Sequence, residues 1–278
     1  MEHTPGPVAR RLFDLVEPIG LLPFVVDDPN EELMALGMRN YWDGYFAARA
    51  APLGLVPAEV VHAVFYNFAD GEVARHLPWV WGVTTPAAAI AARDRGCVRA
   101  LRRLLGDAAE GPDVARAAAL LVRAATSAPT SGRPMYAGLR TLPVPTDTLH
   151  LLWHAAMLLR EHRGDGHVAA LVTVGIGGAE AYMLHAMSEG TPPKSFGRVH
   201  HLPGAHLDAV LDGLRGRGLA DDGGRLTAAG AALEQEVEDR TDELAAPPYD
   251  ALDDAELAEL VRCLESFVPA VRAAGLPG

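Results

Sequence analysis

The stretch Trp153–Leu171, WHAAMLLREHRGDGHVAAL, is the most informative part of the chain. Two apolar segments with helical spacing flank a run of charged and polar side chains that contains Gly164 and Gly166. Glycine is common where helices end, because it adopts the left-handed backbone conformation that other residues avoid. We therefore expect these glycines to end a helix and to place the charged side chains on a turn between two buried helices.

A similar pattern occurs earlier in the chain, so the protein looks duplicated. Trp42 is followed seven residues later by Arg49, and Trp153 is followed at the same spacing by Arg160. In both places a glycine and a further apolar helix come next, although the first copy has the uncharged turn APLG where the second has the charged one. This asymmetry predicts that a ligand or substrate lies at the charged turn of the second repeat.

Helical periodicity dominates the rest of the sequence. Apolar residues recur every three or four positions, as on a helix with one buried face, over 7–17, 31–49, 57–69, 86–105, 111–126, 147–162, 167–174, 178–189, 204–217, 227–245 and 253–273. The pattern predicts a mainly α fold of two helix-turn-helix or winged-helix-like repeats around a common core. The Pro-rich segment 129–145 separates them, which gives one repeat over 1–140 and the other over 141–278.

Strand signals are few and are clearest in residues 218–227, GLADDGGRLT. Two short apolar segments flank an Asp-Asp-Gly-Gly turn, a pattern typical of a hairpin. We therefore expect a small β-wing here. With the predicted helices 204–217 and 227–245 on either side, this part of the chain resembles the end of a winged-helix domain of the MarR type.

Across its whole length the chain resembles a family of actinobacterial proteins described as helix-turn-helix proteins. The residues that carry the resemblance are Trp42–Gly54 (WDGYFAARAAPLG), Val64–Phe68 (VFYNF) and Leu159–His167 (LREHRGDGH). The resemblance implies a fold, and it implies neither catalytic residues nor a cofactor.

The composition argues against several classes of protein. The 24 Lys and Arg residues face 36 Asp and Glu residues, and the resulting net charge of −12 opposes attraction to nucleic acid or to an anionic membrane. No uninterrupted apolar stretch is long enough to cross a bilayer, so we expect a cytoplasmic protein without a membrane partner. Cys97 and Cys263 lack metal-ligand spacing, and the sequence contains no other motif that indicates a metal or a cofactor.

The charged turn allows three interpretations. Its polar residues are Arg160, Glu161, His162, Arg163, Asp165 and His167. They form a structural knot of ion pairs between helices, or the arginines and histidines bind an anionic or polar small molecule. In the third interpretation His162 or His167 is a general acid or base tuned by Asp165, and the protein is an enzyme.

The first repeat supplies an aromatic stripe that ends in an arginine. Trp42, Tyr45 and Arg49 share one face of a predicted helix, and His62 and Tyr66 lie on the next helix. With Trp153 of the second repeat, these side chains form either ordinary core or the wall of a pocket between the repeats. A pocket with two arginines and aromatic walls suits a small organic ligand that is anionic or aromatic.

Binding to DNA depends on where the positive charge lies. The segment 86–105 contains five arginines, Arg93, Arg95, Arg99, Arg102 and Arg103, and these form either a phosphate-binding face or a solvated surface paired with acidic residues of the C-terminal tail. The helix 204–217 contains Asp208 and Asp212 and has arginines only near its end. Asp221 and Asp222 follow in the turn, and this arrangement disfavours DNA there.

These observations favour a protein that binds a small molecule in a pocket lined by aromatic residues and arginines. One alternative is a ligand-responsive transcriptional regulator that binds DNA through the helix from Arg93 to Arg103. The other is a cofactor-independent isomerase, lyase or cyclase of specialised metabolism that uses histidine acid–base chemistry.

Overall fold

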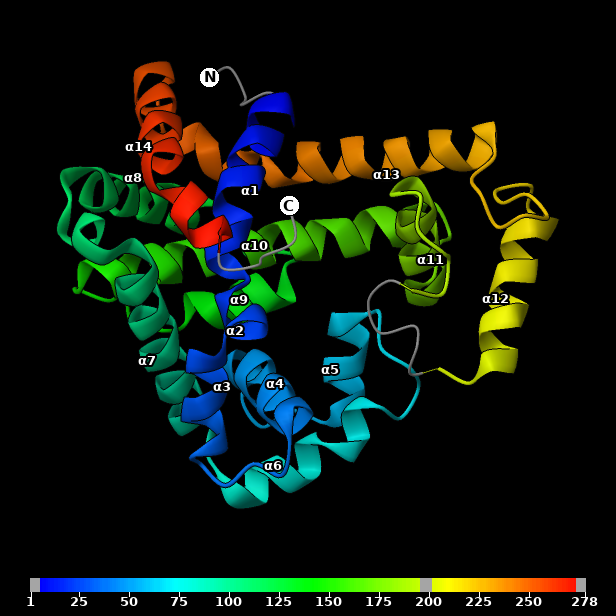
Figure 1. Cartoon of the computed structure of the whole chain (residues 1–278), viewed down its shortest axis with the longest axis horizontal. Helices are drawn as coiled ribbons and strands as arrows, with labels where there is room; N and C mark the ends of the chain where they lie inside the picture. The colour runs from blue at the N-terminus through cyan, green and yellow to red at the C-terminus, as the bar shows by residue number, and fades with distance from the viewer. Residues whose placement is uncertain (1–5, 196–201, 274–278) are drawn as a thin grey trace. The chain divides into compact units, whose positions relative to one another are not determined.

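The structure, a computed structural model, describes residues 6–195 and 202–273, and these are almost wholly helical (Figure 1). The α-helices are α1 Gly6–Gly20, α2 Leu22–Val25, α3 Asp27–Met34, α4 Tyr41–Ala50, α5 Ala58–Phe65, α6 Leu77–Val83, α7 Pro86–Leu105, α8 Pro112–Ser127, α9 Pro134–Arg140, α10 Thr148–Thr173, α11 Gly178–Ser188, α12 Gly204–Gly216, α13 Ala228–Ala245 and α14 Asp254–Arg272. Short 3-10 helices are η1 Ala51–Leu53, η2 Val73–Arg75, η3 Gly106–Glu110 and η5 Pro247–Ala251. The prediction of a mainly α fold is confirmed.

The helix α10 contradicts the expected break in the charged stretch. It runs without interruption from Thr148 to Thr173, straight through Gly164 and Gly166. A glycine inside a helix costs only about 1 kcal/mol relative to alanine, and large apolar residues on both sides, among them Trp153, Leu158 and Leu171, are buried. Burial of a long helix therefore outweighs the two glycines, and the charged residues lie on a helix rather than on a turn.

The chain divides into two compact units that do not follow the sequence order. Unit 1 consists of Met1–Val56, His76–Asp165 and Asp242–Gly278, and unit 2 consists of Pro57–Arg75 and Gly166–Thr241. The helices α10 and α13 each begin in one unit and end in the other. The predicted duplication into 1–140 and 141–278 concerns the origin of the chain and stays a prediction.

The core of unit 1 forms around large side chains from α1, α7, α8, α10 and α14. Trp153 and Tyr136 are completely buried in it. The helices α3 and α7 lie side by side (Figure 1), and at Gly96 they approach so closely that a Cβ atom would lie 2.3 Å from Cα of Pro29. A side chain at position 96 therefore has no room.

Unit 2 has a separate core of residues from α10, α11, α12 and α13, among them Met183 and Leu214. A tight turn follows α5, in which Tyr66 has a φ of 64° and the amide of Asn67 donates to the carbonyl of Phe65 at 2.7 Å. This is a γ-turn with positive φ, which is strained for any residue other than glycine. The close packing of Gly178, where a Cβ would lie 2.5 Å from the Tyr66 carbonyl, holds the turn in place.

The predicted β-wing is reduced to a single contact. Residues 218–227 fold back on themselves, and one antiparallel bridge joins Ala220 to Leu226. Within the described part of the chain no residue belongs to a longer strand. The turn is stabilised instead by Asp221, whose carboxylate accepts hydrogen bonds from the backbone and the side chain of Arg225.

Among the described residues, no single helix is both long and apolar enough to cross a membrane. The pair α10 and α11, bent by 100° at the break between them, meets the criterion by length and composition only.

Candidate functional site

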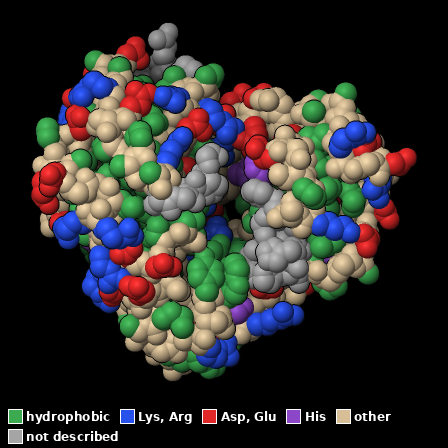
Figure 2. Space-filling model, in the orientation of Figure 1, with side chains coloured by type: hydrophobic (Ala, Val, Ile, Leu, Met, Phe, Trp, Pro, Cys, Tyr) green, Lys and Arg blue, Asp and Glu red, His purple; other side chains and the backbone are tan. Residues whose placement is uncertain are grey.

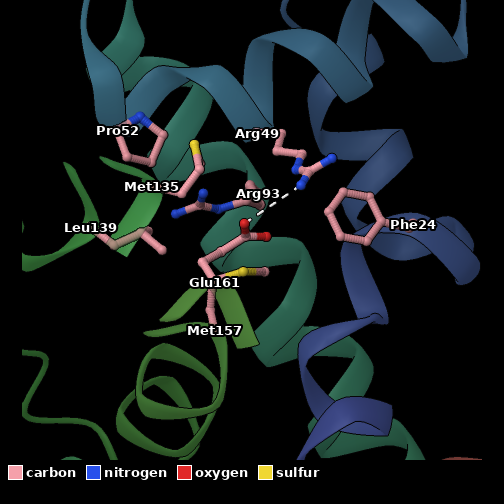
Figure 3. Close-up of a pocket in the computed structure, with 8 residues that line it drawn as sticks. All are labelled: Phe24, Arg49, Pro52, Arg93, Met135, Leu139, Met157 and Glu161. Atoms are coloured by element: carbon pink, nitrogen blue, oxygen red, sulfur yellow. Dashed lines mark ion pairs between the residues drawn. The ribbon is translucent and has the colours of Figure 1, made fainter. Parts of the chain in front are cut away.

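A small cavity in unit 1 brings charged and apolar side chains together (Figure 3). It is lined by Phe24 of α2, Arg49 of α4, Pro52 of η1, Arg93 of α7, Met135 and Leu139 of α9, and Met157 and Glu161 of α10. In the structure the cavity has room for about one water molecule. Five of its eight side chains are apolar, so the three charged groups stand out as the parts that would orient a ligand.

Glu161 joins the two arginines that the repeat pattern singled out. Its Oε1 accepts a hydrogen bond from Nη1 of Arg160 at 2.8 Å, and its Oε2 lies 3.5 Å from Nη2 of Arg49. Arg160 also donates from Nε to Glu17 of α1 at 3.2 Å. The side chain of Glu161 is almost completely buried, so this cluster links α1, α4 and α10 inside unit 1.

The two carboxylates of the cluster respond differently to their surroundings. Burial acts to raise the pKa of Glu161, but the positive charges of Arg49 and Arg160 outweigh it, and the pKa is lowered. Burial raises the pKa of Glu17, and its contact with Arg160 offsets only part of this effect. Glu161 is therefore the permanent anion of the cluster, and Glu17 is the carboxyl that accepts a proton more readily.

Arg93 borders the cavity, and its positive charge is balanced by the neighbouring Asp94. Its guanidinium bonds to Asp94 at 3.0 Å and donates to the carbonyl of Ala48 at 3.0 Å. It also lies over the ring of Trp153, 4.8 Å from the centroid, a cation–π contact. Trp153 therefore contacts a residue that lines the cavity but does not line the cavity itself.

Aromatic rings continue from the cavity along α4. Phe24 lies 5.1 Å from the ring of Tyr45, and Tyr45 lies 5.3 Å from Trp42, measured between centroids. The hydroxyl of Tyr45 accepts a hydrogen bond from Arg49 at 3.0 Å. Tyr45 and Trp42 are both partly exposed, so the aromatic row extends from the surface of unit 1 to the Arg49 end of the cavity.

The predicted acid–base residues have structural contacts. The carboxylate of Asp165 accepts hydrogen bonds from the amides of Met135 and Tyr136 and thereby satisfies the first turn of α9. His162 is buried with its ring against Tyr136, and burial lowers its pKa to about 3, so it is neutral at physiological pH. His167 lies in unit 2, where its Nδ1 is 3.1 Å from the hydroxyl of Thr241.

Asp165 makes a pH-dependent contribution that can be measured. Burial raises its pKa to about 6, although the two amides oppose this shift. Because the native carboxyl holds its proton more tightly than the unfolded one, stability present below about pH 4 is lost as the pH rises through 6, by about 2 to 3 kcal/mol. We expect Asp165→Asn to gain stability relative to the wild type over this interval in urea titrations at pH 4, 5, 6 and 7. A constant difference between the two proteins would contradict the assignment.

The other predicted ligand residues lie elsewhere. Arg163 donates to Asp242 at 2.9 Å and lies over the ring of Phe13. His62 and Tyr66 belong to unit 2, where Nε2 of His62 is 3.4 Å from Asp70 and the hydroxyl of Tyr66 donates to the carbonyl of Ile176. The structure therefore brings Tyr45, Arg49, Arg160 and Glu161 together and leaves these three outside the cluster.

Sequence reasoning missed most of the apolar wall. Phe24, Met135 and Met157 line the cavity, but nothing in their local pattern separates them from ordinary core residues. Glu17 carried a usable signal, since it is a carboxylate among the buried residues of an otherwise apolar helix face. A buried charge of this kind predicts a partner, here Arg160.

Arg95, Arg99 and Arg103 of α7 are paired, but with different acids from those expected. Arg99 bonds to Asp28, Glu31 and Glu32 of α3, and Arg103 bonds to Asp28. The acidic partners thus come from α3 and not from the C-terminal tail. Figure 2 shows basic and acidic side chains intermixed on the visible face, without a continuous basic area.

The surface of unit 2 is acidic. Its seven Lys and Arg residues face thirteen Asp and Glu residues. The arginines near α12 are engaged within the unit: Arg215 with Asp212, Arg217 with Glu180 and Arg225 with Asp221. This charge distribution opposes the approach of phosphate to α12.

Comparison with known proteins identifies one family. No curated protein and no solved structure matches the chain. A family model described as a helix-turn-helix family matches residues 9–277. The match spans nearly the whole length, and the chain therefore belongs to this helix-turn-helix family.

Proposed function

We propose that the protein binds a small polar organic molecule in the cavity of unit 1. The observation that carries the proposal is the position of Glu161, a buried carboxylate that borders the cavity and is contacted by Arg49 and Arg160. Buried ion clusters stabilise folds less well than apolar packing of equal volume. Their occurrence at a cavity therefore favours a role in recognition.

The apolar wall is suited to a change in cavity volume. Met135 and Met157 are unbranched and flexible, and methionine side chains readily adapt to different partners. Leu139 is the remaining side chain of this wall that has rotatable bonds, since Pro52 is rigid. A ligand larger than one water molecule would enter by displacing these side chains, while the helices stay in place.

A thermal-shift screen of the purified chain against a broad panel of metabolites and aromatic acids tests the proposal. We expect at least one compound to raise the melting temperature of the wild type and to have a much smaller effect on Arg49→Lys. The matched control is Arg116→Lys, because Arg116 forms an exposed ion pair with Glu259 and does not line the cavity. A panel without any stabilising compound, or equal shifts in Arg49→Lys, would overturn the proposal.

A second candidate function is regulation of transcription by binding to DNA, which the family match favours because helix-turn-helix folds commonly bind DNA. In this version α11, α12, the turn 218–227 and α13 of unit 2 act as a winged helix of the MarR type. The engaged arginines and the acidic surface of unit 2 argue against it.

Fluorescence anisotropy with random duplex DNA at 50 and 200 mM salt tests this candidate. A DNA-binding protein loses affinity steeply with salt. The loss should be smaller in Arg215→Ala/Arg217→Ala if the end of α12 contacts phosphate, and smaller in Arg99→Ala/Arg102→Ala if α7 does. Absence of binding at 50 mM salt would eliminate non-specific DNA binding and leave ligand binding as the proposal.

A further inference from the structure

We propose that the ligand of the unit 1 cavity is a small aromatic carboxylate, held by Arg49 at its acid group and by Phe24 at its ring. This inference rests on the proposed function and names the chemical class of its ligand. Three features of the cavity carry it: an ion pair that can open, a row of aromatic rings, and a flexible wall that faces them.

Of the ion pairs that link Arg49, Arg160, Glu161 and Glu17, the one between Arg49 and Glu161 has the longest N–O distance. Its 3.5 Å separation exceeds the usual length of a hydrogen bond, whereas Arg160 and Glu161 are 2.8 Å apart. A ligand carboxylate that takes the guanidinium of Arg49 would leave Glu161 bound to Arg160. Arginine suits this exchange, because its planar group binds a carboxylate through two parallel hydrogen bonds.

The charge balance of the cluster depends on the protonation of Glu17. Arg49, Arg93 and Arg160 face the carboxylates of Asp94, Glu161 and Glu17. Glu17 is the carboxyl that most readily takes up a proton, because burial raises its pKa. Protonation of Glu17 would leave three guanidinium groups facing two carboxylates, a balance that an anionic ligand would restore.

Aromatic rings adjoin the arginine end of the cavity. Phe24 and Arg49 lie on the same side of it, across from Pro52 and Leu139 (Figure 3). Behind Phe24 the ring of Tyr45 is 5.1 Å away, and the guanidinium of Arg160 lies 5.4 Å from the centroid of Phe24. A planar ligand ring placed against Phe24 would extend this stack, and aromatic pairs of this kind add affinity beyond their buried area.

The apolar wall of the cavity accommodates a ring by movement of side chains. Met135 and Met157 are buried with exposures of 2% and 4%, so both pack tightly in the absence of ligand. Sulfur atoms make favourable contacts with the edges of aromatic rings, which would replace the apolar contacts that the methionines lose. Met157→Ala shortens one of these two side chains and should enlarge the cavity next to Glu161.

Isothermal titration of the full chain with benzoate, benzamide and benzamidine compares the affinities of three ligands that have nearly the same shape. Benzoate is an anion, benzamide is neutral and benzamidine is a cation. We expect benzoate to bind at least about tenfold more tightly than benzamide, since a hydrogen bond to a charged group is worth more than a neutral one, and benzamidine to bind most weakly. Arg49→Lys should reduce this preference for the acid, and Arg116→Lys should retain it. Met157→Ala, the variant with added space, should bind benzoate at least as tightly as the wild type.

Two outcomes overturn the inference. If benzamide binds as tightly as benzoate and Met157→Ala changes both affinities, the cavity is a ligand site and the proposed function survives without this ligand class. If benzoate binds equally well to the wild type, Arg49→Lys and Met157→Ala, the contact lies elsewhere on the chain. The proposed function fails on a different result. In that case no compound of the thermal-shift panel would stabilise the wild type more than Arg49→Lys.

Discussion

Replacement of Glu161 by glutamine is expected to lower the free energy of unfolding by about 3 to 5 kcal/mol, one of the largest effects of any single polar substitution in the chain. The substitution keeps the shape of the side chain and removes its charge. Arg49 and Arg160 then face a neutral amide inside unit 1, and Arg160 keeps only the bond to Glu17. Removal of one member of a buried ion cluster is costly, because the remaining charge stays desolvated without compensation.

Urea unfolding at pH 7 measures this effect, with Glu259→Gln as the matched control. Glu259 pairs with Arg116 on the surface, and exposed pairs contribute about 0 to 1 kcal/mol. The expected result is a large difference between the two variants of the same chemistry. A loss at Glu161 no greater than that at Glu259 would show that the cluster is hydrated and not a buried element of the site.

Gly96→Ala is expected to destabilise the protein by about 3 kcal/mol or more through steric overlap. The new Cβ would lie 2.3 Å from Cα and 2.6 Å from the nitrogen of Pro29, and 2.8 Å from the carbonyl oxygen of Asp28. All three atoms belong to the backbone of α3, so no side-chain rotation relieves the contact. The helices α3 and α7 must separate, which also disturbs the ion pairs between Asp28 and Arg99.

The control for this substitution is Gly82→Ala in α6. No heavy atom lies within 4 Å of a Cβ at Gly82, so the alanine gains helix propensity, about 0.5 to 1 kcal/mol, without a clash. Thermal and urea unfolding of both variants should therefore shift in opposite directions. Destabilisation of both by the same amount would contradict the close approach of α3 to α7.

Periodicity and capping signals predicted most of the helices. The segment 86–105 was placed correctly at both ends, because Thr85 caps the helix, Pro86 begins it and Gly106 follows its last residue. The prediction for 31–49 was wrong, since α3 ends at Met34 and α4 begins at Tyr41. The signal for that break was present in Asn40, whose side chain accepts hydrogen bonds from the first amides of α4.

The charged part of the site was more predictable than its apolar part. Spacing alone selected Arg49 and Arg160, and the structure places both against one carboxylate, that of Glu161. Charged side chains in an apolar segment are informative because burial without a partner is costly. Methionine and phenylalanine are common core residues, so no pattern distinguishes Phe24 or Met157 from the rest of the core.

The two central glycines show where local propensity fails. Gly164 and Gly166 suggested a turn, but each penalises the helix by only about 1 kcal/mol, whereas burial of one large apolar side chain contributes about 1.5 to 3 kcal/mol. The apolar segments on both sides of the glycines therefore decide the local structure. The division of the chain into units also escaped prediction, because each unit is assembled from segments far apart in the sequence.

The most direct measurement for the ligand site is a crystal structure of the full chain grown with benzoate. We expect density for the ring against Phe24, a carboxylate within hydrogen-bond distance of Arg49, and Glu161 still bonded to Arg160. Density for benzoate only outside the cavity, with Met135 and Met157 packed as in the free protein, would contradict this expectation.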